Sequence, residues 1–174
     1  MEYASSAWDP FQGTHITALE AVQRRAARFA CGNYSREASV SDMLNKLGWR
    51  TLQERRFIAR QAMFYKTVNQ QTATALPSHI TPVSSRPTRE SHNIRFTVPS
   101  THMDLYLYSY FPRTVRFWNI LPKHIVEAQS VDILKELLLK DFLNGHMYMV
   151  APKSTEETPR LGSTSCVSAV GPVY

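Results

Sequence analysis

The sequence predicts a mostly α-helical fold: two small helical subdomains flank an irregular, proline-rich connector, and a disordered tail follows. Apolar residues recur at the helical period in several segments, and Ser or Thr cap candidates precede most of these segments. Strands do not alternate with helices, and there is no internal repeat. The chain has 174 residues, 43% of them hydrophobic and 20% charged, so it lies in the globular range and can bury a core.

The first predicted subdomain, residues 1–76, contains three helices. Each begins with a Ser or Thr that is followed three residues later by an acid, which is the spacing of an N-terminal cap. The expected cap pairs are Thr17 with Glu20, Ser39 with Asp42, and Thr51 with Glu54. Glycine or asparagine follows each helix and ends it. The predicted helices span residues 17–30, 40–47 and 51–69.

The faces of two of these helices differ in character. The first has an apolar face at helical spacing, formed by Leu19, Val22, Ala26 and Phe29, and its arginines lie opposite. The third has a wide apolar arc, which is typical of a helix packed on more than one neighbour. A narrower basic sector completes the third helix. It is formed by Arg55, Arg56, Arg60 and Lys66.

Residues 77–100 are the predicted connector, because Pro, Ser, Thr and Arg dominate them. The alternation in residues 94–98 indicates one short strand or hairpin there. A second low-complexity segment, residues 145–174, shows no periodicity and is predicted to be a disordered tail.

The second helical subdomain, residues 101–144, is rich in aromatic residues. One helix is predicted from Pro112, which suits a first helical position, to the residues before Pro122. A last helix, capped by Ser130, is predicted over residues 131–143. For residues 105–108, extended and helical conformations both fit the pattern.

The sequence contains no recognisable catalytic or metal-binding pattern. The six histidines are scattered, and no nucleophile elbow, P-loop or dinucleotide fingerprint occurs. Asp104 and Asp132 are isolated, so no carboxylate pair is available for two-metal chemistry. We therefore expect no metal, no cofactor and no small-molecule substrate. A free-standing enzyme would need a site that only the fold assembles.

The expected compartment is intracellular, in the cytoplasm or nucleus. Cys31 and Cys166 lie far apart and share no motif, which favours a reducing environment. The N-terminal residues lack the basic and apolar regions of a signal peptide. No run approaches the roughly 20 apolar residues of a membrane span, so no membrane partner is expected.

The formal net charge of +6 favours anionic partners, here the backbone of RNA or DNA. Guanidinium forks match phosphate oxygens, so arginines on helix faces are candidate contacts. The other interpretation is that these charges are solvated or form local salt bridges. The candidate nucleic-acid contacts are Arg24, Arg25, Arg28, Arg55, Arg56, Arg60, Arg95, Arg113 and Arg116.

Three blocks of the chain, in order, resemble the region after the polymerase domain in non-LTR (LINE-type) retrotransposon reverse transcriptases of the jockey and chicken-repeat groups. The first block combines Tyr3-Ala-Ser-Ser-Ala-Trp-Asp-Pro10 with Leu19-Glu-Ala-Val-Gln-Arg-Arg-Ala-Ala-Arg-Phe29. The second is Leu47-Gly-Trp-Arg-Thr-Leu-Gln-Glu-Arg-Arg56. The third is Tyr110-Phe-Pro-Arg-Thr-Val-Arg-Phe-Trp-Asn-Ile-Leu-Pro122. Order and spacing match over residues 2–143.

The resemblance implies a C-terminal, thumb-side fragment of an RNA-directed DNA polymerase polyprotein, cut from a longer parent. In that parent it would hold RNA or DNA beside the polymerase. The family's endonuclease and Asp-Asp motif have no counterpart in this sequence, so no catalytic residue carries over and the chain alone is not expected to be an enzyme.

Two alternatives to nucleic-acid contact follow from the same resemblance. One is a purely structural scaffold that packs on the polymerase domain and, alone, exposes an apolar patch that includes Trp8 and Phe11. The other is a degenerate gene product without activity. A continuous face of exposed arginines would favour binding, and pairing of those arginines with acids would favour the scaffold.

Overall fold

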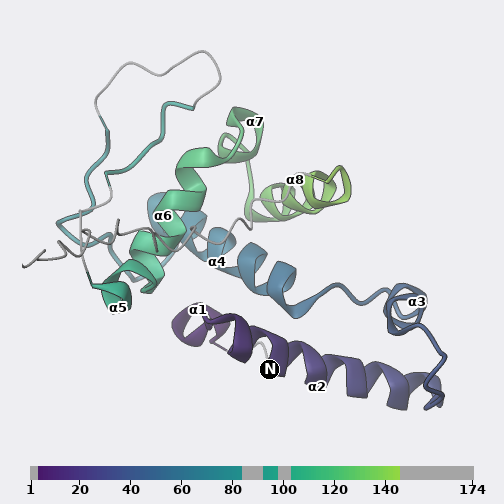
Figure 1. Cartoon of the computed structure of the whole chain (residues 1–174). Coiled ribbons are helices and arrows are strands. Elements are labelled where there is room, and N and C mark those ends of the chain that lie inside the picture. The colour runs from purple at the N-terminus through teal and green to yellow at the C-terminus, as the bar shows by residue number, and fades with distance from the viewer. Residues whose placement is uncertain (1–3, 84–91, 98–102, 146–174) are drawn as a thin grey trace, which may run out of the picture.

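The computed structural model describes residues 4–83, 92–97 and 103–145, and these residues are mostly helical, as predicted (Figure 1). The predicted tail, apart from Gly145, and Arg86 and Arg89 of the connector lie outside the described residues. No helix in the described part has the length and apolar character needed to cross a membrane. The helices are α1 (Ser5–Trp8), α2 (Gly13–Cys31), α3 (Val40–Lys46), α4 (Leu52–Val68), α5 (Asp104–Leu107), α6 (Tyr110–Ile120), α7 (Lys123–Val126) and α8 (Val131–Leu143).

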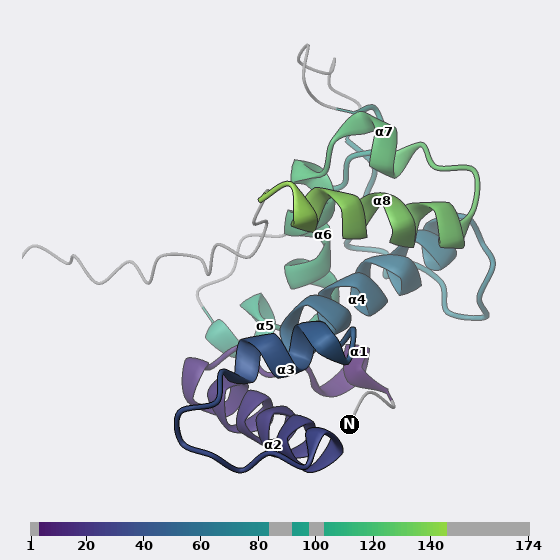
Figure 2. The same cartoon turned by 90° about the vertical axis from the view of Figure 1, so that its right-hand side faces the viewer.

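Helix α4 lies at the centre of the molecule. In both views of the ribbon α6, α7 and α8 lie on one side of α4, and α1 and α2 lie on the other (Figures 1 and 2). Helix α3 packs against α2. The wide apolar arc predicted for α4 agrees with this central position, because the helix contacts neighbours on both sides.

The hydrophobic core lies where α4 meets α6, α7 and α8. Phe64 of α4 packs edge to face on Trp118 of α6, with ring centroids 5.1 Å apart. Leu134 and Leu138 of α8 are fully buried in the same cluster. The connector contributes Phe96, whose ring also packs on Phe64. One core thus contains residues from both predicted helical subdomains.

Three predicted helix caps are confirmed. Ser39 Oγ accepts a hydrogen bond from the main-chain N–H of Asp42 at the start of α3. Thr51 Oγ1 accepts one from Glu54 at the start of α4. The Ser130 hydroxyl caps α8 in the same way. These interactions are local, so the sequence alone determines them.

Other helix boundaries differ from the predictions. Helix α2 begins at Gly13, four residues before the predicted cap at Thr17. The short helices α1 and α7 were not predicted, and α5 settles the open question at residues 105–108 in favour of helix. Four-residue helices carry too little periodicity to be seen in a sequence.

The predicted strand at residues 94–98 is reduced, in the described residues, to an isolated antiparallel bridge between Pro82 and Phe96. Two main-chain hydrogen bonds flank it, from Val83 to Arg95 and from Thr97 to Thr81. Asn119 of α6 also bonds the main chain of Phe96 through both its amide oxygen and its amide nitrogen. This side-chain clamp attaches the connector to α6.

Candidate functional site

Three arginine side chains converge on the carboxylate of Asp9. Nε of Arg56 lies 2.8 Å from Oδ1, and Nη1 of Arg60 lies 2.5 Å from Oδ2. Nη1 of Arg113 lies 3.1 Å from the same Oδ2 and also donates to the main-chain carbonyls of Asp9 and Pro10. We call Asp9, Arg56, Arg60 and Arg113 the Asp9 cluster.

The Asp9 cluster is built from three elements that are distant in sequence. Arg56 and Arg60 are four residues apart on α4, so their side chains lie on the same face of that helix. Arg113 belongs to α6, and Asp9 follows α1 directly. The cluster therefore attaches the segment between α1 and α2 to helices α4 and α6.

Burial determines the electrostatics of this cluster. The side chains of Arg56 and Arg60 are 1% and 3% exposed. Burial lowers the pKa of Arg60 to about 10, and the positive charge of Arg113 acts in the same direction. Burial also lowers the pKa of Arg113. The Arg60 guanidinium carbon lies 5.6 Å from the ring centroids of both Phe57 and Phe117, and these cation–π contacts stabilise its charge.

The prediction of an exposed basic sector on α4 is wrong for two of its arginines, Arg56 and Arg60. Arg56 and Arg60 lie inside the fold and are ion-paired with Asp9, so this conformation does not offer them to a nucleic-acid strand. The helical spacing explains why Arg60 is buried. Arg60 lies about 40° from Phe64 around the helix axis, so it borders the apolar arc. Arg55 lies on the opposite, exposed side of α4.

Arg113 of α6 also falls within this correction, because its guanidinium is half-buried and ion-paired with Asp9. Only part of the predicted nucleic-acid surface therefore stays available. The remaining six candidates are distributed over four elements: Arg24, Arg25 and Arg28 on α2, Arg55 on α4, Arg95 in the connector and Arg116 on α6.

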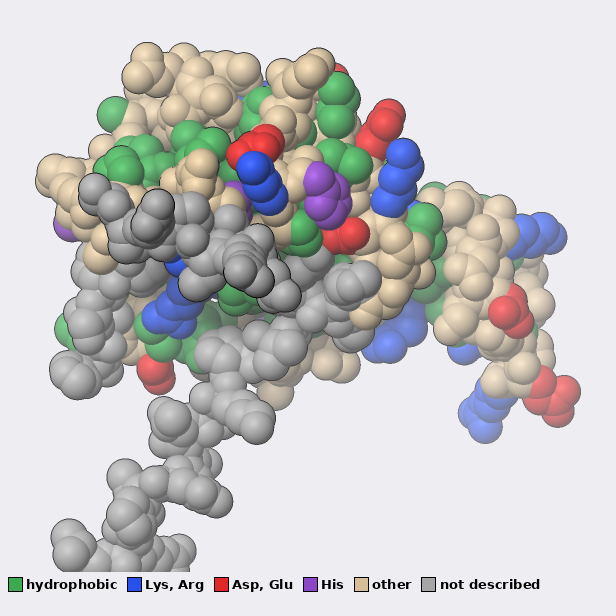
Figure 3. Space-filling view, turned by 90° about the horizontal axis from the view of Figure 1, so that it is seen from above, with side chains coloured by type: hydrophobic (Ala, Val, Ile, Leu, Met, Phe, Trp, Pro, Cys, Tyr) green, Lys and Arg blue, Asp and Glu red, His purple; other side chains and the backbone are tan. Residues whose placement is uncertain are grey.

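These six residues differ in exposure. Arg24, Arg25 and Arg55 are exposed, and the others are half-buried. Where Figure 3 is not drawn in grey, Lys and Arg side chains are scattered among acidic ones and form no continuous basic patch on that face. Contact of these six arginines with RNA or DNA stays a prediction.

Asp9 is the important residue that sequence reasoning missed. A signal was present, because Asp9 stands between Trp8 and Pro10 in a segment otherwise rich in apolar residues. A carboxylate in such a setting requires a cationic or hydrogen-bonding partner when the segment packs. The sequence does not say which arginines supply it, since the partners are 47, 51 and 104 residues away.

The apolar face of α2 points into solvent. Val22 and Phe29 are exposed, Phe29 at 77%, as are Ala18 and Ala26. We call these four residues the α2 stripe. The buried positions of α2 are instead Gln23 and Ala27. Of the apolar face predicted from the sequence, Val22, Ala26 and Phe29 are exposed and Leu19 is half-buried, so the described part of the chain leaves most of that face uncovered.

Polar contacts explain why α2 is oriented in this way. The Gln23 side chain donates to the carbonyl of Arg50 at 2.6 Å. The Glu20 carboxylate accepts from the main-chain N–H of Gln53, 2.9 Å away, at the start of α4. Glu20 thus satisfies a free N–H of another helix rather than completing the predicted capping box with Thr17. These bonds turn the polar side of α2 inward.

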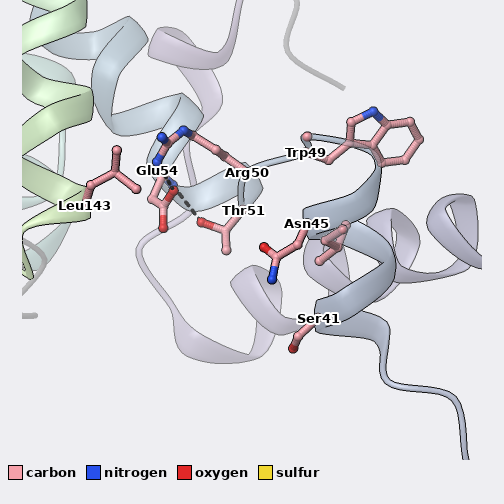
Figure 4. Close-up of a pocket in the computed structure, with 9 residues that line it drawn as sticks. Ser41, Asn45, Trp49, Arg50, Thr51, Glu54 and Leu143 are labelled. Atoms are coloured by element: carbon pink, nitrogen blue, oxygen red, sulfur yellow. Dashed lines mark hydrogen bonds and ion pairs between the residues drawn. The ribbon is translucent and has the colours of Figure 1, made fainter.

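An open hollow of about 430 Å³ lies between α3, the start of α4 and the end of α8. Figure 4 shows the Arg50 guanidinium beside the Glu54 carboxylate, with Trp49 turned away from them. These two charged groups are 3.7 Å apart. Beside this surface ion pair, the Thr51 hydroxyl accepts the cap bond from the main-chain N–H of Glu54. The remaining lining residues are Ser41, Leu44, Asn45, Gly48 and Leu143.

Among the described residues no group of three His, Cys, Asp or Glu side chains is placed to hold a metal ion. Comparisons with protein-family models, with curated proteins and with solved structures found no match. The proposals below therefore rest on the sequence blocks and on the contacts described above.

Proposed function

We propose that the chain is the non-catalytic C-terminal part of a non-LTR retrotransposon reverse transcriptase and serves as a scaffold that packs on the polymerase domain. The single observation that carries the scaffold role is the exposed α2 stripe. It presents apolar side chains at helical spacing on one face of a helix, and an exposed face of this kind is typical of a surface that packs on a partner.

The Asp9 cluster supports the same proposal. Arg56 and Arg60 form ion pairs with an acid of the chain itself and do not form an open basic face. The cluster fixes the segment that enters α2, and so it holds the α2 stripe in one orientation relative to α4. A scaffold needs such a fixed orientation, because a docking face that moves loses affinity to conformational entropy.

Trp8 and Phe11, expected in the apolar patch of a scaffold, are both partly exposed. Phe11 stacks on Tyr108, with ring centroids 4.1 Å apart and planes 3° from parallel. This stack joins the segment before α2 to the segment before α6. Phe11 therefore supports the frame of the docking face, while the α2 stripe supplies most of its exposed apolar surface.

The scaffold proposal is tested by binding to a polymerase domain. The probe is the polymerase domain of a chicken-repeat-type reverse transcriptase, ending before the first resembling block, titrated with the full chain by calorimetry. We expect binding that Phe29→Glu weakens by at least about tenfold, because a charge in an apolar interface is left unpaired. The matched control is Ile120→Glu, at the far end of α6 and 66% exposed, which should bind like the wild type. Equal binding by both variants would contradict the proposal.

A second role for the chain, contact with nucleic acid, is favoured by one observation. Arg24 and Arg25 are exposed on α2 and form no ion pair with any described residue, and Arg28 lies one turn further on. If these arginines contact phosphates, fluorescence anisotropy with single-stranded RNA should show binding that weakens linearly with the logarithm of salt concentration. Replacing Arg24 and Arg25 by Gln should reduce that slope, whereas the same change at Lys135 and Lys140 of α8 should not. No binding at low salt would exclude the role.

A further inference from the structure

The charges of the Asp9 cluster do not balance. Three guanidinium groups carry three positive charges, and among the described residues their one acidic partner is Asp9. Two positive charges therefore remain within the fold. A buried charge without a counter-charge is strongly unfavourable, so this arrangement calls for a further anion.

Several donors of the cluster are also unused. Nη1 and Nη2 of Arg56 and Nε of Arg60 are buried and have no hydrogen-bond partner among the described residues. Asp9 engages only Nε of Arg56, so the two terminal nitrogens of that guanidinium remain as a pair. Two parallel N–H groups of this kind match two oxygens of a phosphate or a carboxylate.

We propose that Arg56, Arg60 and Arg113 form an oxyanion-binding site of the phosphate class, in which Asp9 occupies one part of the arginine surface. The Arg56 terminal nitrogens and Arg60 Nε hold the oxyanion, and Arg113 lies at the entrance. The site is distinct from the α2 stripe and does not depend on the proposed scaffold role.

The position of the cluster determines which phosphates can enter. Arg56 is closed to solvent, whereas the side chains of Asp9 and Arg113 are 10% and 16% exposed, so the Asp9–Arg113 edge is the part of the cluster nearest to solvent. The segment at Asp9 and Pro10 covers this edge and is held there by Arg113. The nitrogens that would hold the ion are closed to solvent, so orthophosphate or sulfate enters only when this segment shifts. A polynucleotide strand would need its removal.

The test is the thermal stability of the full chain in orthophosphate or sulfate against sodium chloride of equal ionic strength. We expect the melting temperature to rise with orthophosphate and to saturate, which is the behaviour of a ligand that binds the folded state. In Asp9→Asn, which removes a like charge beside the ion, the apparent affinity should increase by about tenfold or more. In Arg56→Met the saturable rise should disappear. The matched control is Asp132→Asn, which should respond like the wild type.

Two further measurements identify the ligand and guard against a variant that does not fold. A single-stranded oligonucleotide at the same phosphate concentration should not reproduce the saturable rise, which separates free oxyanion from nucleic-acid backbone. Calorimetric titration of orthophosphate into the wild-type chain gives a reading even if a variant does not fold. A wild-type chain that shows no orthophosphate binding, or whose melting temperature rises equally in chloride, would overturn the proposal. So would an oligonucleotide that stabilises the chain when orthophosphate does not.

Discussion

Replacing Asp9 by Asn should be among the most destabilising single changes where the segment after α1 meets α4 and α6. The substitution keeps the size of the side chain but removes the one carboxylate, among the described residues, that contacts Arg56, Arg60 and Arg113. Breaking a buried ion pair by removal of one partner costs about 3–5 kcal/mol, because the other charge stays buried without compensation. A domain of this kind is stable by only about 5–15 kcal/mol, so the loss is a large share of the total.

Urea denaturation followed by far-ultraviolet circular dichroism is the suitable assay, since urea is uncharged and does not screen the cluster. With a urea dependence of about 2 kcal/mol per molar, a loss of about 4 kcal/mol lowers the midpoint by about 2 M. The buffer should contain no phosphate or sulfate. The matched control is Asp132→Asn on α8, an exposed acid paired with Lys135 at 3.0 Å. An exposed pair in the first turn of a helix contributes about 0.5–1 kcal/mol. A midpoint shift for Asp9→Asn no larger than that of the control would refute the reasoning.

Three further predictions concern stability. His92 is buried, and its Nε2 lies 2.9 Å from the carbonyl oxygen of Trp118, so the neutral ring donates there; burial lowers the pKa of His92. As the pH falls, the unfolded chain takes up the proton on His92 before the folded chain does. The free energy of unfolding should therefore be highest above about pH 6.5 and decrease below it. Urea midpoints measured at pH 5–8 should decrease less in His92→Phe than in the wild type. Trp118→Phe removes the indole N–H that donates to the carbonyl of Ile94 at 2.8 Å, and the lost bond and volume should lower the free energy of unfolding by about 2 kcal/mol in the same urea assay. Thr51→Ala removes the cap of α4 and should lower the free energy of unfolding by about 1 kcal/mol, with Thr51→Ser restoring most of it.

Local chemistry in this chain is predictable from its sequence. The caps at Ser39, Thr51 and Ser130 depend on groups three residues away, and all three form as expected. The capping box expected at Thr17 does not form, because a contact that is distant in sequence replaces it. Glu20 has the right spacing, but its carboxylate bonds to the N–H of Gln53, a contact over 33 residues that no local pattern contains.

The arginines of α4 show the same limit for side-chain roles. Charge and helical spacing placed Arg55, Arg56 and Arg60 in one sector, and composition favoured an exposed basic surface. The partner that draws two of them inward is Asp9, far away in the sequence. The identity of a buried ion pair depends on tertiary packing, so the sequence predicts a requirement for a partner but not which residue provides it.

The apolar face of α2 was correctly located along the helix, yet its environment was not predicted. Periodicity identifies which residues share a face, and Val22 and Phe29 do share one. It does not identify the surface that the face meets. The contacts of Glu20 and Gln23 with the start of α4 decide the orientation, and they leave the α2 stripe in solvent.

Hydrogen exchange of the full chain, read by mass spectrometry, tests the central claim that α2 lacks its packing partner. Helix α4 buries ten of its residues, whereas α2 buries only Gln23 and Ala27. We predict that amides of α2 exchange far faster than those of α4, because α2 opens locally at a much smaller free energy than the core. Addition of the polymerase domain should then slow exchange in α2 selectively. Amides of α2 that are protected as strongly as those of α4 in the chain alone would contradict the account.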